Sequence, residues 1–569
     1  MKQLLIVLSW FAFLPIAAQK QKDIEYIARR NATIAAMDSL LKNAQVQRDI
    51  LVKFADQKCK EFHKDPVLMS AIATSFAIYA GHEDIAVSRF QELIKSNPKN
   101  EQCYIDYANL LYSLALKQGT ASIEADYVKR AKLQIDSAKV VAPKSLKPYQ
   151  AWVGFRAPYV HISGVEEDVA QEIEAWNKRH PDSQAYLMAA RIFMDADISK
   201  INNEDLKKGA DQQRIINMAV GYFEKAGVEN MRRTEILDLA RQYYQSSIYT
   251  TDKVPVFEKG AAMACKGLSL SSEMSERERI ITFGKYVLWN GAQIASRDTT
   301  DLGRVWADSA AVMADAYCRY PSDMGWQDCF YSALAYQEKE RYEESIAMYR
   351  KALASAGIVD NNQYFRIGAF PAMENIISCY QRLRDYASVI DERKKMISRK
   401  QEKSVLSHRD LRNLVLDYNR IVRDDKSNAQ DSILAYQGID ATCQVIIDSI
   451  ESGKYADMSD PSQYYWLQMN AHKRLDKLMP GQHDSQLTRN CADRVIRRLE
   501  KVSGRSEAEN SRLADAYSVW ANYYIGLKDM RKWAAYAQSI LDVYPDYLSS
   551  ETARENWRKA IKQYGGRRR

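Results

Sequence analysis

The segment Cys329–Leu353 reads CFYSALAYQEKERYEESIAMYRKAL and decides the fold, because it contains two amphipathic stretches joined by a short charged break. In its second half, Ser345, Tyr349 and Ala352 follow one another at steps of four and three residues. Residues at these steps share one face of a helix. The segment therefore predicts a helical hairpin, within a unit that spans residues 326–356.

The same seam of residues recurs along the chain and ends each time at a proline, which cannot continue a helix. Ala86, Phe90, Leu93 and Pro98 set the spacing. It recurs at Ala131, Ile135, Ala138 and Pro143; at Val169, Ile173, Trp176 and Pro181; at Ser309, Met313, Ala316 and Pro321; and at Trp533, Ala537, Ile540 and Pro545. Such periodicity indicates stacked helical hairpins. The best units are 67–98, 101–143, 277–321, 326–356 and 514–545.

The helix before each seam has a signature of its own, in which a small residue follows a large one. The pairs are Tyr107 with Ala108, Phe283 with Gly284, and Trp520 with Ala521. A small side chain lets the second helix of a hairpin approach closely, while the large neighbour fills the remaining space. These positions are therefore expected to lie between the helices of a hairpin.

Together these patterns resemble the tetratricopeptide repeat (TPR) family, in an exported bacterial form. In Cys329–Leu353 the residues at the family's positions are Ala333, Tyr336, Tyr342, Ser345, Tyr349 and Ala352. The resemblance implies an all-α fold, an α-solenoid of stacked helix-turn-helix hairpins over residues 19–564. A helix at 552–564 is expected to cap the stack, and residues 565–569 to form a basic tail.

The composition agrees with an all-α protein and excludes several other classes. The 569 residues are 46% hydrophobic and 27% charged, which is typical of a folded chain and too apolar for a disordered one. Only 22 Gly and 13 Pro leave few turn-forming residues for a sandwich or barrel. The net charge of +8 does not indicate nucleic-acid binding, because no interleaving of basic and aromatic residues typical of a recognition module is present.

The first residues are interpreted as a signal peptide, residues 1–18. Lys2 precedes the apolar run Leu4–Ile16, and Ala17 and Ala18 offer small residues for cleavage. No cysteine stands at the cleavage point for a lipid anchor, and no later run is long enough to cross a membrane. The expected product is exported and periplasmic, with no transmembrane segment in the mature chain. A buried N-terminal helix is the alternative.

The sequence contains no pattern typical of catalysis. The seven histidines include no pair at the i, i+4 spacing of a helical metal site, and no phosphate-binding or nucleophile motif is present. His82, Glu83 and Asp84 cluster at a turn, where the two carboxylates favour a helix N-terminus over a metal. We therefore predict no enzyme activity, no catalytic residue, no metal site and no cofactor.

The eight cysteines allow two interpretations. An even number in an exported chain permits disulfides, with Cys318 and Cys329 the first pair to test. Cys59, Cys265, Cys318, Cys443 and Cys491 fall in second helices, however, where small buried residues are expected. Buried thiols are the preferred interpretation.

Two function classes follow. The first is a scaffold that holds a protein or peptide partner on its concave face, as stacked helical repeats do. The second is a glycan-binding nutrient-capture protein, which the surplus of Tyr and Trp would suit. We favour the first, because most of these Tyr residues fall at packing positions. The family's clamp for a terminal carboxylate is not supported: Asn109 and Asn522 match its Asn, but Ile105 and Ser518 stand where it needs Lys.

The sharpest candidate site is one face of the helix predicted at 408–423. Leu411, Leu414, Val415, Tyr418 and Val422 form its buried side, and Arg409, Arg412, Leu416, Arg420 and Arg423 form a stripe on the other side. We predict that a concave-face site for an acidic peptide or an anionic glycan is formed by Arg409, Arg412, Asn419, Arg420, Arg382 and Lys473. The alternative is a solvated face that Asp410 and Asp417 partly neutralise.

Overall fold

The computed structural model describes residues 21–43, 47–78, 82–248, 250–454 and 460–565. The predicted signal peptide and residues 566–569 of the predicted tail lie outside these ranges. Among the described residues, the chain is helical and forms no strand; one isolated antiparallel bridge joins Asn362 and Ile367. None of these helices is both long and apolar enough to cross a membrane. The predicted all-α class is confirmed.

The chain divides into two compact units, residues 1–298 and 299–569. The helices of the first unit are, in chain order, α2 (Gln21–Lys42), α3 (Arg48–Glu61), α4 (Pro66–Ile78), α5 (Glu83–Ser96), α6 (Glu101–Lys117), α7 (Asp126–Val141), α8 (Lys147–Arg156), α9 (Val165–Arg179), α10 (Ala185–Asp195), α11 (Glu204–Lys207), α12 (Gln212–Ala226), α13 (Arg233–Ser246), α14 (Val254–Ser269), α15 (Glu276–Arg279) and α16 (Lys285–Ala295). A π-helical turn, Ile280–Gly284, joins α15 to α16.

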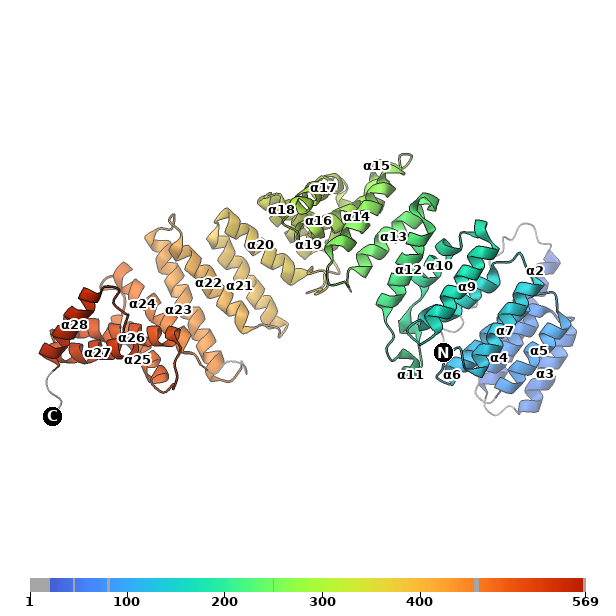
Figure 1. Ribbon diagram of the computed structural model, residues 1–569, viewed down its shortest axis with the longest axis horizontal. Helices are drawn as coiled ribbons and strands as arrows, with labels where there is room; N and C mark the ends of the chain where they lie inside the picture. The colour runs from blue at the N-terminus through green and yellow to red at the C-terminus, as the bar shows by residue number, and fades with distance from the viewer. Residues whose placement is uncertain (1–20, 44–46, 79–81, 249, 455–459, 566–569) are drawn as a thin grey trace. The chain divides into compact units, whose positions relative to one another are not determined.

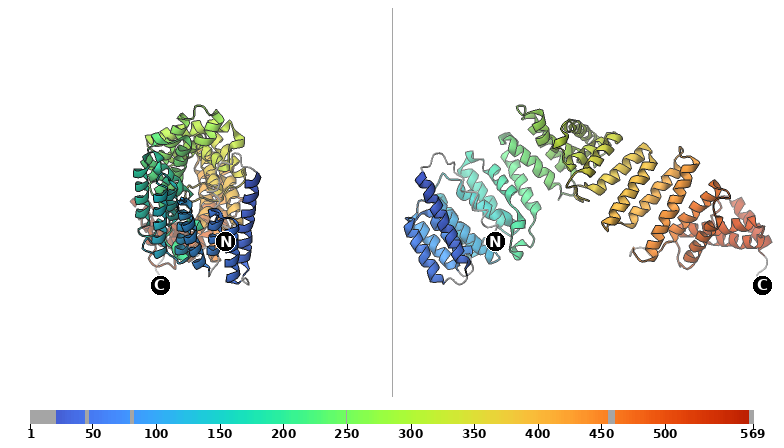
Figure 2. Two further views of the ribbon diagram at one scale, coloured as in Figure 1. Left: turned by 90° about the vertical axis from the view of Figure 1, so that its right-hand side faces the viewer. Right: turned by 180° about the vertical axis from the view of Figure 1, so that it is seen from behind.

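The helices of the second unit are α17 (Asp301–Cys318), α18 (Trp326–Glu338), α19 (Tyr342–Ala354), α20 (Ala369–Leu383), α21 (Tyr386–Glu402), α22 (His408–Arg423), α23 (Ala429–Glu451), α24 (Ser462–Leu478), α25 (Ser485–Leu499), α26 (Glu507–Gly526), α27 (Met530–Val543) and α28 (Glu551–Tyr564). Within each unit, the two helices of each hairpin lie side by side as antiparallel neighbours (Figure 1, Figure 2).

Helices pair in sequence order, as a solenoid of TPR-like hairpins requires. In the first unit the closely packed pairs are α4 with α5, α6 with α7, α8 with α9, α10 with α12, and α13 with α14. In the second unit they are α18 with α19, α20 with α21, α22 with α23, α24 with α25, and α26 with α27. Each second helix also packs on the next first helix, for example α19 on α20. Each hairpin therefore buries its apolar faces only by stacking on its neighbours.

The seam residues explain this packing where the predicted register holds. In α5, Ala86, Phe90 and Leu93 are fully buried, and in α27 Ala537 and Ile540 are too. The seam predicted in α17 holds only in part. Ala316 is buried as predicted, but Ser309 and Met313 are only half-buried, and Ala310, Ala314 and Tyr317 are buried beside them. Counting back from the proline fails here because Pro321 stands three residues after the end of α17, whereas Pro98 and Pro181 stand two residues after the ends of α5 and α9.

The boundary between residues 298 and 299 falls inside the unit predicted at 277–321, so the pairing of the two helices in that unit stays a prediction. Helix α28 packs on α27 through Trp557, Ala560 and Ile561, which are partly buried, while no residue of α28 is fully buried. One face of α28 is thus left to solvent, as a capping helix requires.

Candidate functional site

Helix α22 is the most sharply amphipathic element of the second unit. Its first turn is closed by a capping box, in which the Asp410 carboxylate accepts from the Ser407 backbone N–H (2.9 Å) and hydroxyl (2.6 Å). Its buried apolar residues are Leu411, Leu414, Val415 and Tyr418, as predicted, while Val422 is only half-buried. The opposite side carries what we call the arginine face, made of Arg409, Arg412, Leu416, Arg420 and Arg423, all of them exposed.

The register of α22 is set by Tyr418. Its ring packs so closely against Gly438 of α23 that any side-chain carbon at Gly438 would overlap ring atoms. The ammonium of Lys394 in α21 lies 5.9 Å from the same ring. Tyr418 is thus held between two second helices, which turns the arginine face away from both of them.

The two acidic residues of α22 point inward, away from the arginine face. Asp410 is 4% exposed and pairs with Lys400 of α21. Burial alone would raise the pKa of Asp410, but hydrogen bonds from Lys400 and Ser407 outweigh it and lower that pKa. Asp417 is 1% exposed and accepts from Arg393 Nε of α21 (2.8 Å) and Gln381 Nε2 of α20 (2.8 Å).

The arginines of this face therefore differ in their pairing. Arg420 Nη1 donates to Asp417 Oδ1 (3.0 Å) and forms an ion pair with it. In the part of the chain that the structure describes, Arg409 and Arg412 form no ion pair. Arg409 and Arg412 lie about one helical turn apart, and their charges face solvent. Leu416, which is 47% exposed, lies on the next turn. Asn419 is half-buried and donates its side-chain N–H to the Val415 carbonyl (3.0 Å).

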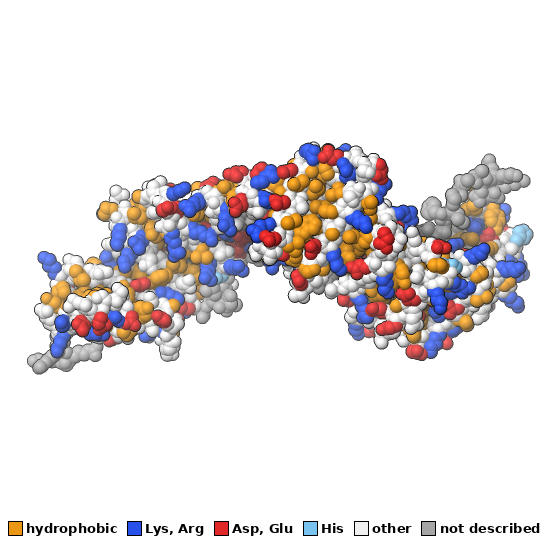
Figure 3. Space-filling model, turned by 45° about the horizontal axis from the view of Figure 1, so that its top comes forward, with side chains coloured by type: hydrophobic (Ala, Val, Ile, Leu, Met, Phe, Trp, Pro, Cys, Tyr) orange, Lys and Arg blue, Asp and Glu red, His pale blue; other side chains and the backbone are white. Residues whose placement is uncertain are grey.

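Side chains link the neighbouring first helices to α22. From α20, Gln381 reaches Asp417; from α24, the Tyr464 hydroxyl meets His408 Nε2. Arg412 lies close to that hydroxyl: burial raises the pKa of Tyr464 to about 12, although the charge of Arg412 opposes the rise. These contacts join α20 and α24 to α22. Lys and Arg side chains, blue in Figure 3, are numerous on the drawn face of the second unit, at the left.

The two outer residues of the predicted site are less central to it. Arg382 on α20 is exposed, and its charge acts on Glu338 of α18, whose pKa is raised by burial and lowered in part by Arg382. Lys473 on α24 is half-buried and forms no ion pair among the described residues. Among the described residues, Arg409, Arg412 and Arg423 of the arginine face thus form no ion pair.

The residue that sequence reasoning missed is Arg393, which fixes Asp417. Arg393 is 4% exposed and also donates Nη1 to Glu374 Oε2 (2.7 Å). The sequence did carry a signal for this position. Arg393 follows Tyr386 by seven residues, as Tyr349 follows Tyr342 in the hairpin of α18 and α19, so Arg393 corresponds to the core residue Tyr349. An arginine at a core position requires carboxylate partners, which the buried Asp417 and the half-buried Glu374 supply.

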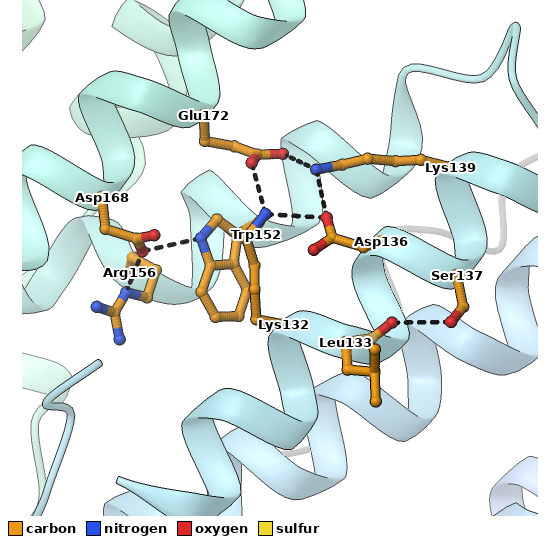
Figure 4. A network of polar contacts seen from close by, with 9 residues as sticks. All are labelled: Lys132, Leu133, Asp136, Ser137, Lys139, Trp152, Arg156, Asp168 and Glu172. Carbon is orange, nitrogen blue, oxygen red and sulfur yellow. Dashed lines mark hydrogen bonds and ion pairs between the residues drawn. The ribbon is translucent and has the colours of Figure 1, made fainter. Parts of the chain in front are cut away.

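A second charged cluster, in the first unit, is balanced within itself (Figure 4). Lys132 Nζ binds Asp136 (3.0 Å) and Glu172 (2.8 Å), and Lys139 Nζ contacts the same two carboxylates. Nearby, the buried Arg156 Nε lies 3.0 Å from Asp168, which also accepts from Trp152 Nε1 (2.9 Å). Because three cations face three carboxylates, this cluster joins α7, α8 and α9 structurally and offers no free charge to a ligand.

Metal and thiol sites give no alternative centre. Among the described residues, no group of three or more His, Cys, Asp or Glu side chains is arranged to hold a metal ion. All eight cysteines are free thiols. Six are buried, as preferred from the sequence, whereas Cys318 is half-buried and Cys265 is exposed. The expectation of burial was wrong for Cys265, because its side of α14 does not face a neighbouring helix.

No protein-family model matches this sequence, and neither does any curated relative. Among solved structures, similar chains include one in Naa15/Naa10 bound to HypK-THB (12% identity, TM-score 0.22, 94% of this chain and 100% of that one). Yeast Tom70 gives 12% identity and a TM-score of 0.23 over 94% and 96% of the two chains. The human IFIT1 dimer with PPP-AAAA gives 13% and 0.20 over 84% of each. The TPR-like fold rests on the helix pairing itself, since TM-scores this low add no argument.

Proposed function

We propose that this protein is a non-enzymatic scaffold that binds an acidic peptide segment of a protein partner on the surface of α20, α22 and α24. One observation carries the proposal: α22 directs both of its carboxylates inward and leaves Arg409 and Arg412 exposed without an ion pair among the described residues. A solvent-exposed helix face with no binding role would be stabilised by carboxylates interspersed among its arginines.

The chemistry of this surface suits a carboxylate-bearing segment. Guanidinium groups bind carboxylates through two parallel hydrogen bonds, and like charges held close together reinforce one another's field. Leu416 adds an exposed apolar side chain between the unpaired arginines and Arg420. The expected partner segment therefore carries carboxylates next to an apolar residue.

The glycan-binding alternative has less support. A sugar would need exposed aromatic ring faces, but the half-buried rings of Trp520, Tyr524 and Tyr536 stack on one another at centroid distances of 5.8 to 6.1 Å. Other rings are buried outright, among them those of Tyr331, Tyr349 and Tyr464. An anionic glycan on the arginine face itself is left as an outcome of the test.

We further propose that the scaffold acts in the cell envelope. This location rests on the predicted signal peptide, residues 1–18, and on the expectation of cleavage before Gln19. A signal-sequence cleavage assay on the full chain, with the mature N-terminus read by mass spectrometry, tests it. An uncleaved product retained in the cytoplasm would contradict the location and leave the peptide site untouched.

The test of the binding site is a double charge reversal, Arg409→Glu with Arg412→Glu. A short fluorescein-labelled peptide of Glu and Leu is titrated by anisotropy, with its Gln and Leu counterpart and a heparin fragment as comparisons. Each charge-assisted hydrogen bond contributes roughly 1.5–3 kcal/mol. We therefore expect the reversal to weaken binding of the acidic peptide by at least about tenfold.

The matched control reverses two arginines of second helices, Arg497→Glu with Arg531→Glu, which are also exposed and form no ion pair among the described residues. It changes the net charge equally and should bind as the unmodified protein does. An equal loss of peptide affinity in both double variants would show that the effect comes from net charge alone. Binding of heparin but not of the peptide would favour the glycan.

A further inference from the structure

Two histidines that the binding surface does not use meet at the turn between α24 and α25. His472 in α24 is 5% exposed, and His483 lies half-buried in the turn. Nδ1 of His472 is 3.2 Å from Nε2 of His483, and the ring centroids are 5.2 Å apart at an interplanar angle of 23°. One imidazole N–H therefore donates directly to the other ring.

The second ring nitrogen of His472 is engaged by a carboxylate. Nε2 of His472 lies 3.2 Å from Oδ1 of Asp440 in α23, which also accepts from Gln468 Nε2 (2.9 Å). His472 thus connects α23 to the α24–α25 turn through a chain of three side chains. We call Asp440, His472 and His483 the histidine latch.

This geometry fixes where the protons lie. Burial alone would lower the pKa of His472, but the Asp440 carboxylate and the nearby Cys491 thiol outweigh it and raise that pKa to about 9. At neutral pH His472 is therefore an imidazolium that donates Nε2–H to Asp440 and Nδ1–H to His483. His483 can accept this hydrogen bond only in its neutral form.

Other titratable groups lie near the latch. From α25, the buried thiol of Cys491 interacts with His472. On α24, Asp476 accepts from the Thr488 hydroxyl of α25 (2.8 Å). In the turn, Asp484 caps α25 by accepting from the Gln486 N–H (2.9 Å).

We propose that the histidine latch is an acid-sensitive switch, which holds the α24–α25 turn against α23 at neutral pH and releases it in acid, when the two facing imidazoles are both protonated. Histidine is the side chain whose charge changes between about pH 8 and 5. Protonated His483 has no acceptor nitrogen for His472 and places a second positive charge against the first. The interaction then becomes repulsive, and the turn opens.

The two histidines give opposite pH dependences. The latched state requires an acceptor nitrogen on one of the two facing imidazoles, so protection of the turn is lost when acid protonates both rings. The raised pKa of His472 stabilises the folded turn below its unfolded pKa of about 6.5, and this contribution is lost as pH rises through about 9. Protection of the turn should therefore be greatest at a pH above that at which both imidazoles are protonated and below about 9, where His472 loses its proton.

The test is hydrogen–deuterium exchange of the full-length protein, followed by mass spectrometry on peptides that cover residues 476–488. Rates at about pH 7.5 and about pH 5.5 are corrected for intrinsic exchange. We expect the corrected protection of the turn to fall at least about tenfold on acidification, while α26 and α27 keep theirs.

Variants separate the latch from general acid lability. His483→Asn should lose the pH dependence between these two values, and His472→Gln should lose the decline toward alkaline pH. His63→Asn is the matched control, since His63 lies exposed in another turn with φ 51°, which Asn tolerates. Unchanged protection of the wild-type turn at acid pH, or the same loss in His483→Asn, would overturn the proposal.

Discussion

The ring of Tyr418 in α22 lies against Gly438 in α23 and occupies the space that a side chain at this position would need. Tyr418 is buried, and Gly438 lets the two helices of this hairpin approach until ring and backbone touch. The same contact turns the arginine face outward. Packing and candidate function in this hairpin thus depend on one residue pair.

Gly438→Ala should destabilise the second unit. The new methyl group would overlap the Tyr418 ring, and overpacking of a well-packed site typically costs ~1–3 kcal/mol. We expect a lower thermal midpoint by circular dichroism. Gly221→Ala in α12 is the control, because a Cβ there meets nothing within 4 Å. That change should be neutral or stabilise by up to about 1 kcal/mol. If both variants melt alike, the close approach of α22 and α23 is wrong.

Asp417→Asn should be the most damaging single substitution near the arginine face. It leaves the buried Arg393 with only Glu374, and removing one partner of a buried ion pair costs about 3–5 kcal/mol. Urea unfolding followed by tryptophan fluorescence measures the loss. Replacing the pair together, Arg393→Met with Asp417→Leu, should recover most of it. A double variant as unstable as the single one would show that the pair is not the cause.

The repeat architecture could be predicted from sequence because its signal is local. In α5, Ala86, Phe90 and Leu93 lie within two helical turns, and their spacing alone places them on one buried face. The same reasoning holds only in part in α17, whose proline stands one residue farther from the helix end than that of α5. Helix existence was therefore easier to predict than helix register.

The candidate site could be predicted only in part. The arginine stripe follows from helical spacing, and the structure does expose it. The inward turn of Asp410 and Asp417 could not be read from α22 alone, since their partners Lys400 and Arg393 come from α21. Partner choice among buried charges depends on three helices at once, which one-dimensional periodicity does not encode.

Asp410 gives a prediction about pH. Its pKa is lowered in the folded protein, so its stabilising contribution is present above the unfolded value of about 3.9 and is lost as pH falls through the folded pKa. Asp410→Asn should therefore cost about 1–2 kcal/mol at neutral pH, and the difference from wild type should vanish in strong acid. Thermal melts across this pH range measure it.

The comparison variant is Asp431→Asn, at the same capping-box position in α23. Asp431 accepts from the Asn428 backbone N–H (3.1 Å) and forms no ion pair among the described residues. Its substitution should cost less than that of Asp410. Equal costs would mean that Lys400 contributes nothing to the effect.

Ala108→Leu in α6 tests the small residue of a first helix in the other unit. Ala108 is fully buried, next to Tyr107, whose ring stacks on Phe90 of α5 at 5.6 Å. The larger side chain should lower stability by ~1–3 kcal/mol. Ala36→Leu, on an exposed position of α2, should change it by less than about 0.5 kcal/mol. Identical melting of the two variants would refute the predicted hairpin register.

Leu416→Ala separates the binding role of the arginine face from its structural role. Leu416 is exposed, so its truncation should change the free energy of unfolding by less than about 0.5 kcal/mol. If the partner segment seats an apolar side chain here, the Glu and Leu peptide should bind several-fold more weakly, since each buried methylene contributes about 0.8 kcal/mol. An all-Glu peptide should bind both proteins equally, because Arg409 and Arg412 are unchanged. Anisotropy titrations of both peptides decide the matter: equal loss for the two peptides would show that Leu416 only shapes α22 and contacts no partner.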